Sequence, residues 1–304
     1  MIGQALTRAL LDLDHQIYLL GRDRSRMIKK LGADSELITW DDLGHNQDLL
    51  NPIDLIINLS GENIGEKRWS EKQKENIIKS RVQSTLLLAK FCAGRASQKE
   101  NKKIRLFNAS AIGIYANPQD TDKNSYDESS EISERPQTFL SQVAQSWEKA
   151  LEPAEKAGVP VTKMRFSVVL SDQGGALGKM LPAFKFGLGG ILGSGAQLFS
   201  WISLHDLVRA IIFLIDHPEI TGPINLVAPE VLTQKVFAET LASVIKRPCF
   251  LKIPGWVLKL QFGEMAQELL LSGLSVKSKR LDQHGFIFED KELKTALERI
   301  FIKK

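Results

Sequence analysis

The sequence predicts an α/β protein in which helices alternate with the strands of a parallel sheet. Short apolar runs, typical of strands buried on both faces, recur along the first half of the chain. Between them lie segments of ten or more residues whose apolar side chains have helical spacing, and this alternation is typical of βαβ units. The predicted strands are 16–20, 53–59, 104–110 and 159–170, and the predicted helices are 2–13, 70–95 and 139–157.

Composition and charge argue against several classes of function. The formal net charge of +4 is small for 304 residues, and 7% of the residues are aromatic. We therefore expect no nucleic-acid and no membrane partner, because such surfaces need a basic stripe with interleaved aromatic side chains. Cys92 and Cys249 lack metal-ligand spacing, so we expect free thiols, no metal site and a reducing compartment. No stretch approaches the roughly 20 apolar residues that span a bilayer, so we expect a cytoplasmic protein.

The chain opens inside a pattern typical of dinucleotide-binding folds. Such a fold normally begins with an apolar strand, a glycine-rich turn and a helix whose N-terminus holds the pyrophosphate. Here residues 1–6 look like the end of that turn, with Gly3 as its last glycine, and the first strand is missing. Because that strand is central in the sheet, its absence would leave two neighbouring strands with unpaired edges. We expect the natural protein to begin further upstream.

A basic residue follows the first apolar strand. Arg22 comes directly after Gly21, where such a fold lies beside the ribose of the adenosine. An arginine there can pair with the 2′-phosphate of NADP, whereas an acidic residue would bind the 2′-hydroxyl of NAD. A solvated charged turn is the other interpretation, and the residues alone leave both open.

Longer strings along the whole chain resemble one family. They are NLSGENI at 58–64, RW at 68–69, SR at 80–81, the glycine-rich segment 174–182 and FSWISLHDL at 199–207. These strings are similar to the epimerase-like family of the short-chain dehydrogenase/reductase superfamily, often described as sugar-nucleotide epimerases or cell-division-inhibitor homologues. The segment after residue 263 resembles that family's short C-terminal module. The resemblance implies a Rossmann-type, doubly wound parallel sheet and a preference for NADP(H).

The resemblance also implies which residues contact the cofactor. Leu59 and Ser60 follow a predicted strand, at the edge where ligands collect in open α/β sheets. Arg81, taken alone, would be a surface charge on a helix, and only the resemblance makes it a ligand. The implied cofactor-binding residues are Gly3, Gly21, Arg22, Leu59, Ser60, Asn76, Arg81 and Val168.

The catalytic residues typical of this superfamily are incomplete here. Its reductases and epimerases use a tyrosine with a lysine four residues later, because proton transfer needs a tuned group within hydrogen-bond distance. Where the resemblance places that pair, the chain has Phe139 and Val143. Ser110 fits the position of the serine that polarises the carbonyl. Tyr115 is the candidate general acid, although a ring that packs under the nicotinamide is an equally good interpretation. Ser110 and Tyr115 are the predicted catalytic residues.

Two further patterns receive mainly structural interpretations. Gly187, Gly190 and Gly193 match G-x-x-G-x-x-G, but this motif has meaning only between a strand and a helix. We interpret them as a loop that could close over a substrate, or as a structural turn. His205 and Asp206 precede a predicted helix, and Asp206 is better explained as a helix cap or first-turn acid than as half of a catalytic dyad.

Together these observations predict an NADP(H)-binding, epimerase-like oxidoreductase acting on a nucleotide sugar or a small carbonyl or hydroxyl compound. Residues 1–172 would form the cofactor-binding core, and residues 173–304 a smaller substrate-binding region with a helical C-terminal module. A strand near 223–228 would return to the core sheet. The alternative is a non-catalytic NADP(H)-binding regulatory or sensor protein on the same fold. We expect a small-molecule substrate, and a homodimer is compatible with the sequence.

Overall fold

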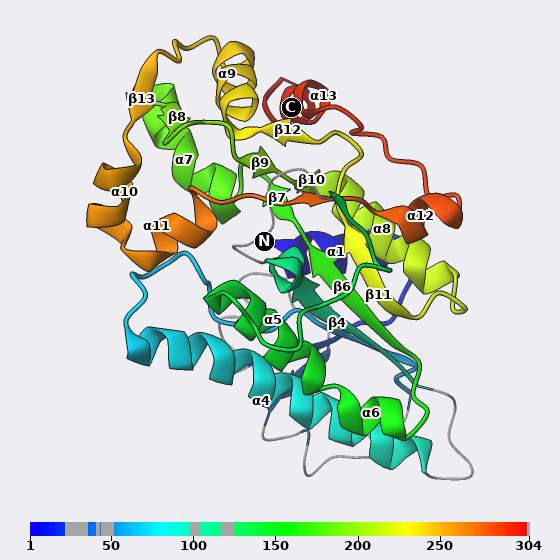
Figure 1. Ribbon diagram of the computed structural model, residues 1–304. Helices are drawn as coiled ribbons and strands as arrows, with labels where there is room; N and C mark the ends of the chain where they lie inside the picture. Colours follow the sequence, from blue (N-terminus) through cyan, green and yellow to red (C-terminus); the bar gives the residue numbers. More distant parts are fainter. Residues whose placement is uncertain (22–35, 41–42, 44–51, 98–103, 117–124, 303–304) are drawn as a thin grey trace.

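The centre of the molecule is a parallel sheet of four strands in the order β11-β6-β4-β3 (Figure 1). The computed structural model describes residues 1–21, 36–40, 43, 52–97, 104–116 and 125–302. The α/β architecture predicted from the alternation of strands and helices is confirmed. The strands are β3 (Leu55–Asn58), β4 (Arg105–Ala111), β6 (Val161–Phe166) and β11 (Gly222–Leu226).

Helices cover both faces of this sheet. On one face, apolar side chains of α1 and α8 pack on strand residues such as Phe107 and Met164, and both of these are almost completely buried. On the other face, Leu88 and Cys92 of α4 pack with Leu106 of β4 and with residues of α6. The helices are α1 (Ile2–Leu11), α4 (Glu71–Ala96), α5 (Phe139–Lys149), α6 (Glu152–Lys156) and α8 (Leu204–Asp216).

Strands β1 (Tyr18–Gly21) and β2 (Glu36–Thr39) form a second, separate parallel sheet. Among the described residues, β1 pairs only with β2, and β3 pairs only with β4. In the described part of the chain, β1–β2 and the central sheet are therefore two separate parallel sheets.

Two predicted elements are each divided in two. The predicted strand 159–170 is β6 followed by β7 (Val168–Leu170), which leaves the central sheet and pairs with β10 (Trp201–Ser203). The predicted helix 139–157 is α5 followed by α6, because Pro153 near the start of α6 has no backbone N–H to continue the first helix. Both predictions had the correct element type and missed the break.

The remaining elements form short strand pairs and helices around the ends of β7 and β10. Their apolar core includes Trp201 and Phe237, both buried. Within the described residues, no helix combines the length and the apolar character needed to cross a bilayer. The helices are η2 (Ile112–Tyr115), α7 (Gly175–Lys185), α9 (Gln234–Val244), α10 (Gly255–Phe262), α11 (Glu264–Leu269), α12 (Lys279–Gln283) and α13 (Leu293–Phe301). The paired strands are β5 (Ser125–Tyr126) with β14 (Ser275–Val276), β8 (Gly190–Leu192) with β13 (Leu251–Ile253), and β9 (Leu198–Phe199) with β12 (Leu232–Thr233).

The glycine pattern at 187–193 has a structural role. Gly190 begins β8, and a Cβ placed on it would lie 2.4 Å from the carbonyl oxygen of Leu251 on β13. Gly187 and Gly193 have φ angles of 73° and 59°, in the region that favours glycine. The segment is therefore a strand flanked by two turns, not a loop that closes over a substrate.

Candidate functional site

The N-terminus of α1 lies beside the carboxyl ends of the core strands, near the centre of Figure 1. A Cβ placed on Gly3 would lie 3.8 Å from Cδ1 of Leu59, which follows β3. Met1 contacts the turn after β7, since a Cβ on Gly175 would lie 3.3 Å from its methyl carbon. The sequence thus correctly placed the start of α1 at the edge of the sheet where ligands collect in this class of fold.

Most of the predicted cofactor-binding residues are half-buried. Arg22 lies outside the described residues, so the structure does not place it. Arg81 is the buried member of the set, with 9% of its surface exposed. The half-buried members are Gly3, Gly21, Leu59, Ser60, Asn76 and Val168.

Arg81 projects from α4 onto the turn that follows β3. Its guanidinium lies against Gly61, where an added Cβ would be 3.1 Å from both Cγ and Cζ of the arginine. One terminal nitrogen donates to the carbonyls of Glu62, at 2.9 Å, and Ile77, at 3.1 Å, while Trp147 stacks with the guanidinium at 4.9 Å. The buried Nε has no hydrogen-bond partner among the described residues. Burial lowers the pKa of Arg81 to about 10, so the side chain is still cationic at neutral pH.

A buried network of polar side chains also holds the turn that follows β3. Ser60 donates from Oγ to Oδ1 of Asn58 at 2.6 Å, and Asn58 donates to Oδ1 of Asn108 at 2.6 Å and to Oγ1 of Thr85 at 2.9 Å. Trp147 also donates to Thr85, at 3.0 Å. Because buried amides need their hydrogen bonds satisfied, this network holds the exit of β3 against α4 and α5.

The two predicted catalytic residues lie in a second buried network. Ser110 is 2% exposed and donates to Oε1 of Glu148 at 2.7 Å. Glu148 forms a two-pronged ion pair with Arg165, at 2.8 and 2.9 Å. Arg165 also donates to the hydroxyl of Tyr115 at 2.6 Å, and Tyr115 donates to Asn225 at 3.0 Å. Both hydroxyls are therefore engaged inside the protein.

Electrostatics in this second network favour a neutral phenol. Burial raises the pKa of Tyr115, and the neighbouring Arg165 only partly opposes that effect. Burial is the largest single influence on Arg165 and opposes its charge, but the hydrogen bonds and charges of Glu148 and Tyr115 together outweigh it and raise the arginine pKa. Tyr115 thus remains protonated near neutral pH, with its proton directed at an amide oxygen.

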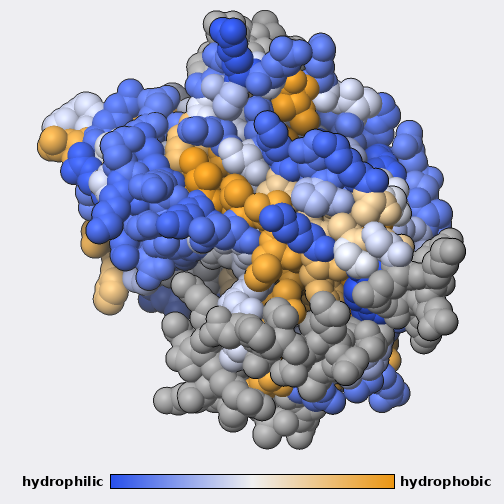
Figure 2. Space-filling model, turned by 90° about the horizontal axis from the view of Figure 1, so that it is seen from below, coloured by the Kyte–Doolittle hydropathy of each residue, from blue (hydrophilic) through white to orange (hydrophobic). Residues whose placement is uncertain are grey.

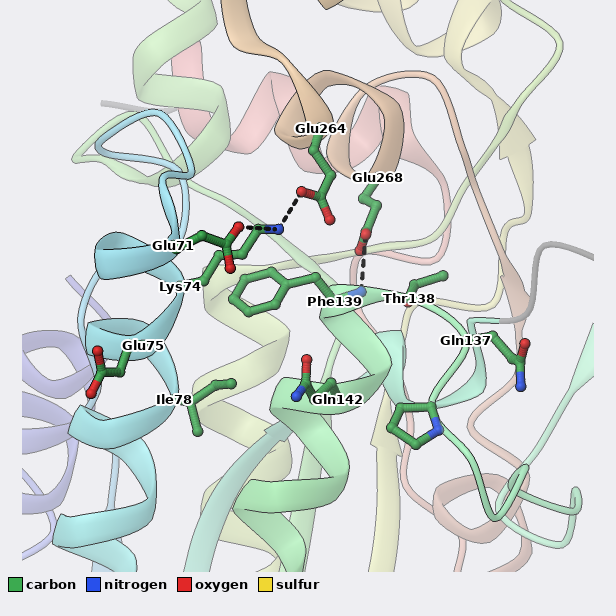
Figure 3. A pocket seen from close by; sticks show the side chains of 11 residues that line it. Glu71, Lys74, Glu75, Ile78, Gln137, Thr138, Phe139, Gln142, Glu264 and Glu268 are labelled. Carbon is green, nitrogen blue, oxygen red and sulfur yellow. Dashed lines mark hydrogen bonds and ion pairs between the residues drawn. The ribbon is translucent and has the colours of Figure 1, made fainter.

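A cavity of about 470 Å³ lies between α4, α5 and α11 (Figure 3). Glu268 reaches from α11 and accepts hydrogen bonds from the backbone N–H groups of Phe139, at 2.9 Å, and Leu140, at 2.8 Å. Lys74 forms ion pairs with Glu71, at 3.3 Å, and with Glu264. The cavity is therefore lined by both the core and the C-terminal region. Its lining includes Phe139, which stands where the superfamily's tyrosine was expected.

Phe139 and Val143 are both buried, at 6% and 5% exposure. Phe139 packs edge-on against Trp69, with ring centroids 4.7 Å apart. Neither Glu268 nor the Glu148–Arg165 pair was predicted. No local pattern indicates that Glu268 binds the start of α5, 129 residues earlier in the chain.

The His205–Asp206 pair is structural, as interpreted from the sequence. Ser203 caps α8 by accepting from the Asp206 N–H at 3.0 Å, and Asp206 is the first-turn acid. Its buried carboxylate accepts from the backbone of Glu289 and Asp290, while His205 contacts the side chain of Glu289 at 2.8 Å. Among the described residues, no group of three or more His, Cys, Asp or Glu side chains could hold a metal ion.

Sequence comparison gives consistent relatives over nearly the whole chain. The model of the NAD dependent epimerase/dehydratase family matches residues 1–226, and a domain of unknown function (DUF1731) matches residues 253–300. The chain is 36% identical to epimerase family protein Mb2239 of Mycobacterium bovis over 299 residues, covering 98% of this chain and 93% of that protein. It is 38% identical to epimerase family protein SH2119 of Staphylococcus haemolyticus over 299 residues, covering 98% and 95%.

Solved structures agree with this assignment. Human epimerase family protein SDR39U1 (isoform 2), crystallised with NADPH, shares 31% identity at a TM-score of 0.86, covering 99% of this chain and 95% of that one. UDP-N-acetylglucosamine 4-epimerase from Bacillus cereus has the same fold, with a TM-score of 0.73 at 15% identity over 99% and 94% of the two chains. The resemblance seen in the sequence is confirmed: the chain belongs to the NAD dependent epimerase/dehydratase family.

Proposed function

We propose that this protein binds NADP(H) at the carboxyl edge of its core sheet and works as an epimerase-like oxidoreductase. Its substrate would be a nucleotide sugar or a small carbonyl or hydroxyl compound. The NADPH-bound SDR39U1 structure, 31% identical over 99% of this chain, supports the phosphorylated coenzyme, although another neighbour, a UDP-glucuronic acid 4-epimerase, was solved with NAD. When bound, the nicotinamide would supply hydride chemistry, and the protein would supply position and electrostatics.

The observation that carries this proposal is the burial of the charged Arg81 side chain with one nitrogen left without a hydrogen-bond partner among the described residues. Arg81 is 9% exposed, and its Nε lacks any partner in the described part of the chain. The charge of Glu62 stabilises this guanidinium only in part, because burial still lowers its pKa to about 10, so a further anion would stabilise it. It lies at the exit of β3, beside Gly61 and close to Ser60. A dinucleotide pyrophosphate or ribose oxygen at this edge would supply the missing acceptor, so these residues fit the cofactor.

We propose that the substrate occupies the cavity between α4, α5 and α11. Its walls come from the core and from the C-terminal region, as expected for a substrate held between the two parts of the chain. Lys74, Gln137 and Gln142 offer hydrogen-bond donors there (Figure 3). Ser110 and Tyr115 stay the proposed catalytic residues. Neither lines this cavity, and both would have to exchange an internal hydrogen bond for one to the substrate.

That requirement also favours a second candidate, a non-catalytic NADP(H)-binding sensor. Phe139 and Val143 have no proton to transfer, and the hydroxyls of Ser110 and Tyr115 are held by Glu148, Arg165 and Asn225. A chain that keeps the cofactor site while its hydroxyls serve the core would bind NADPH without turnover.

Two measurements test the proposal and separate the candidates. NADPH should raise the melting temperature more than NADH at equal concentration, because a ligand stabilises the folded protein in proportion to its binding. Hydride transfer is then measured with a panel of nucleotide sugars and carbonyl compounds. Turnover that disappears in Ser110→Ala or Tyr115→Phe supports the enzyme. NADPH binding without turnover supports the sensor, and the absence of any NADPH-dependent shift refutes both.

A further inference from the structure

Five large apolar side chains project into solvent along one edge of the molecule. Their exposed fractions are 81% for Phe186, 61% for Leu188, 73% for Phe250, 70% for Trp256 and 73% for Leu260. We call this set the apolar edge. Isolated exposed apolar residues are common on protein surfaces, but a gathering of large ones marks a surface that meets a partner.

The fold brings the apolar edge together from two stretches of the chain, residues 186–188 and residues 250–260. β13 pairs in parallel with β8, and Nε of Arg247 donates to the carbonyl of Lys185 at 2.8 Å. α10 begins two residues after β13, and Trp256 and Leu260, four residues apart, share one face of it. α7, β8, β13 and α10 lie together at the left of Figure 1, and apolar atoms project among hydrophilic ones at the left edge of Figure 2.

Positive charge surrounds the apolar edge. The sequence contains no Asp or Glu in residues 173–205 or in residues 240–263. Three of the acidic groups that border these segments have basic partners: Asp206 pairs with Arg209, Glu239 lies 3.9 Å from Lys235, and Glu264 pairs with Lys74. Burial raises the pKa of the Cys249 thiol, and Glu239 also lies close enough for its charge to raise that pKa further. The exposed cations that flank the apolar side chains are Lys185, Lys246, Arg247, Lys252 and Lys259.

We propose that the apolar edge is a docking surface for an anionic lipid bilayer. Projecting Trp, Phe and Leu side chains enter the head-group region of a membrane, and neighbouring Lys and Arg side chains attract anionic lipid phosphates. Four of the five flanking cations are lysines, a residue depleted in protein–protein interfaces. A second copy of this chain, docked edge to edge, would bring two basic surfaces together, which charge repulsion opposes.

This proposal departs from the expectation of no membrane partner, and the reason is spatial. The aromatic content of 7% is low for the whole chain, and Phe186 lies some sixty residues before Phe250 and Trp256. The pairing of β8 with β13 brings these two stretches to one edge.

The test is cosedimentation of the purified protein with vesicles. Vesicles of phosphatidylcholine mixed with phosphatidylglycerol should sediment the protein, and vesicles of phosphatidylcholine alone should not. The double variant Trp256→Ser/Leu260→Ser should lose binding. Lys252→Gln and Lys259→Gln should each weaken it about fivefold. Ile287→Ser is the matched control, because Ile287 is 68% exposed and follows α12 on the opposite side of Figure 1.

All of these side chains are exposed, so the variants should keep the melting temperature of the unaltered protein, which is measured alongside. The proposal is overturned if the protein fails to sediment with the anionic vesicles, or if it binds both vesicle types equally. It is also overturned if the Trp256/Leu260 variant binds as well as the unaltered chain. A dimer that dissociates in that variant, without lipid binding, would instead assign the edge to a second copy.

Discussion

Replacing Arg81 by methionine separates cofactor binding from folding. Methionine keeps the length and apolar contacts of the side chain and removes its charge. Burial lowers the pKa of Arg81 to about 10, and the difference from the ordinary arginine value corresponds to a cost of about 3 kcal/mol for keeping the cation there. Two hydrogen bonds to the carbonyls of Glu62 and Ile77 and the contact with Trp147 offset a similar amount. We therefore expect the free energy of unfolding without ligand to change by less than about 2 kcal/mol.

The affinity for NADPH should respond much more strongly. A hydrogen bond from a charged donor contributes about 1.5–3 kcal/mol, so loss of the bond from Arg81 should raise the Kd for NADPH roughly tenfold to a hundredfold. The Kd is measured by calorimetric titration of the protein with NADPH, and the melting temperature of the unliganded protein is measured in parallel.

Arg95 provides a matched control on the same helix. It is 6% exposed and donates to the carbonyl of Ile53 at 2.8 Å, which places it before β3, whereas Arg81 lies after that strand. Arg95→Met should therefore leave the Kd for NADPH unchanged, whatever it does to stability. An unchanged Kd in Arg81→Met, or equal losses in the two variants, would refute the role given to Arg81.

Three other changes test separate parts of the structure. Arg22→Ala should weaken NADPH binding and leave NADH binding unchanged, because only NADP carries the 2′-phosphate; equal effects on both coenzymes in a titration would contradict the selectivity proposed for this residue. Glu148→Gln should lower the free energy of unfolding in urea by about 3–5 kcal/mol, because it leaves the buried Arg165 without its carboxylate. Glu155→Gln, which breaks the partly exposed pair with Lys163, should cost less than about 1 kcal/mol, and similar losses in the two variants would be evidence against the buried pair. Burial raises the pKa of Cys92 to about 12, and the side chain is 0% exposed, so iodoacetamide should modify half-buried Cys249 first and Cys92 only on unfolding; early modification of Cys92, seen by mass spectrometry, would show that the core around α4 opens locally.

Sequence patterns predicted the core elements because their causes are local. The strands of the central sheet are short apolar runs, and the starts of α4 and α5 follow the capping residues Ser70 and Thr138, whose side chains accept from the first turn of each helix. The position of Gly3 beside Leu59 also followed from the order of elements, since α1 had to start at the carboxyl edge of the sheet.

Other features depend on distant parts of the chain and left no local signal. Glu148 and Arg165 look like surface charges in sequence, and they become a buried pair only because the strand register places Arg165 opposite Ser110. The exit of β7 from the central sheet is equally hidden, because its partner β10 lies some thirty residues further on. Burial of the predicted catalytic hydroxyls could not be foreseen for the same reason.

Helix α5 carries both Phe139 and Val143, which replace the tyrosine–lysine pair, and Glu148, which forms the buried ion pair with Arg165. Its first turn is held by Glu268 through the N–H groups of Phe139 and Leu140, and its last turn by Glu148 through Ser110 and Arg165. A helix held by carboxylates at both ends is fixed in position and offers no titrating side chain where the superfamily has its tyrosine. Neither Phe139 nor Val143 can therefore donate a proton in the proposed reaction. Tyr115 is the candidate general acid in the same buried network, and loss of turnover in Tyr115→Phe would support the enzyme over the sensor.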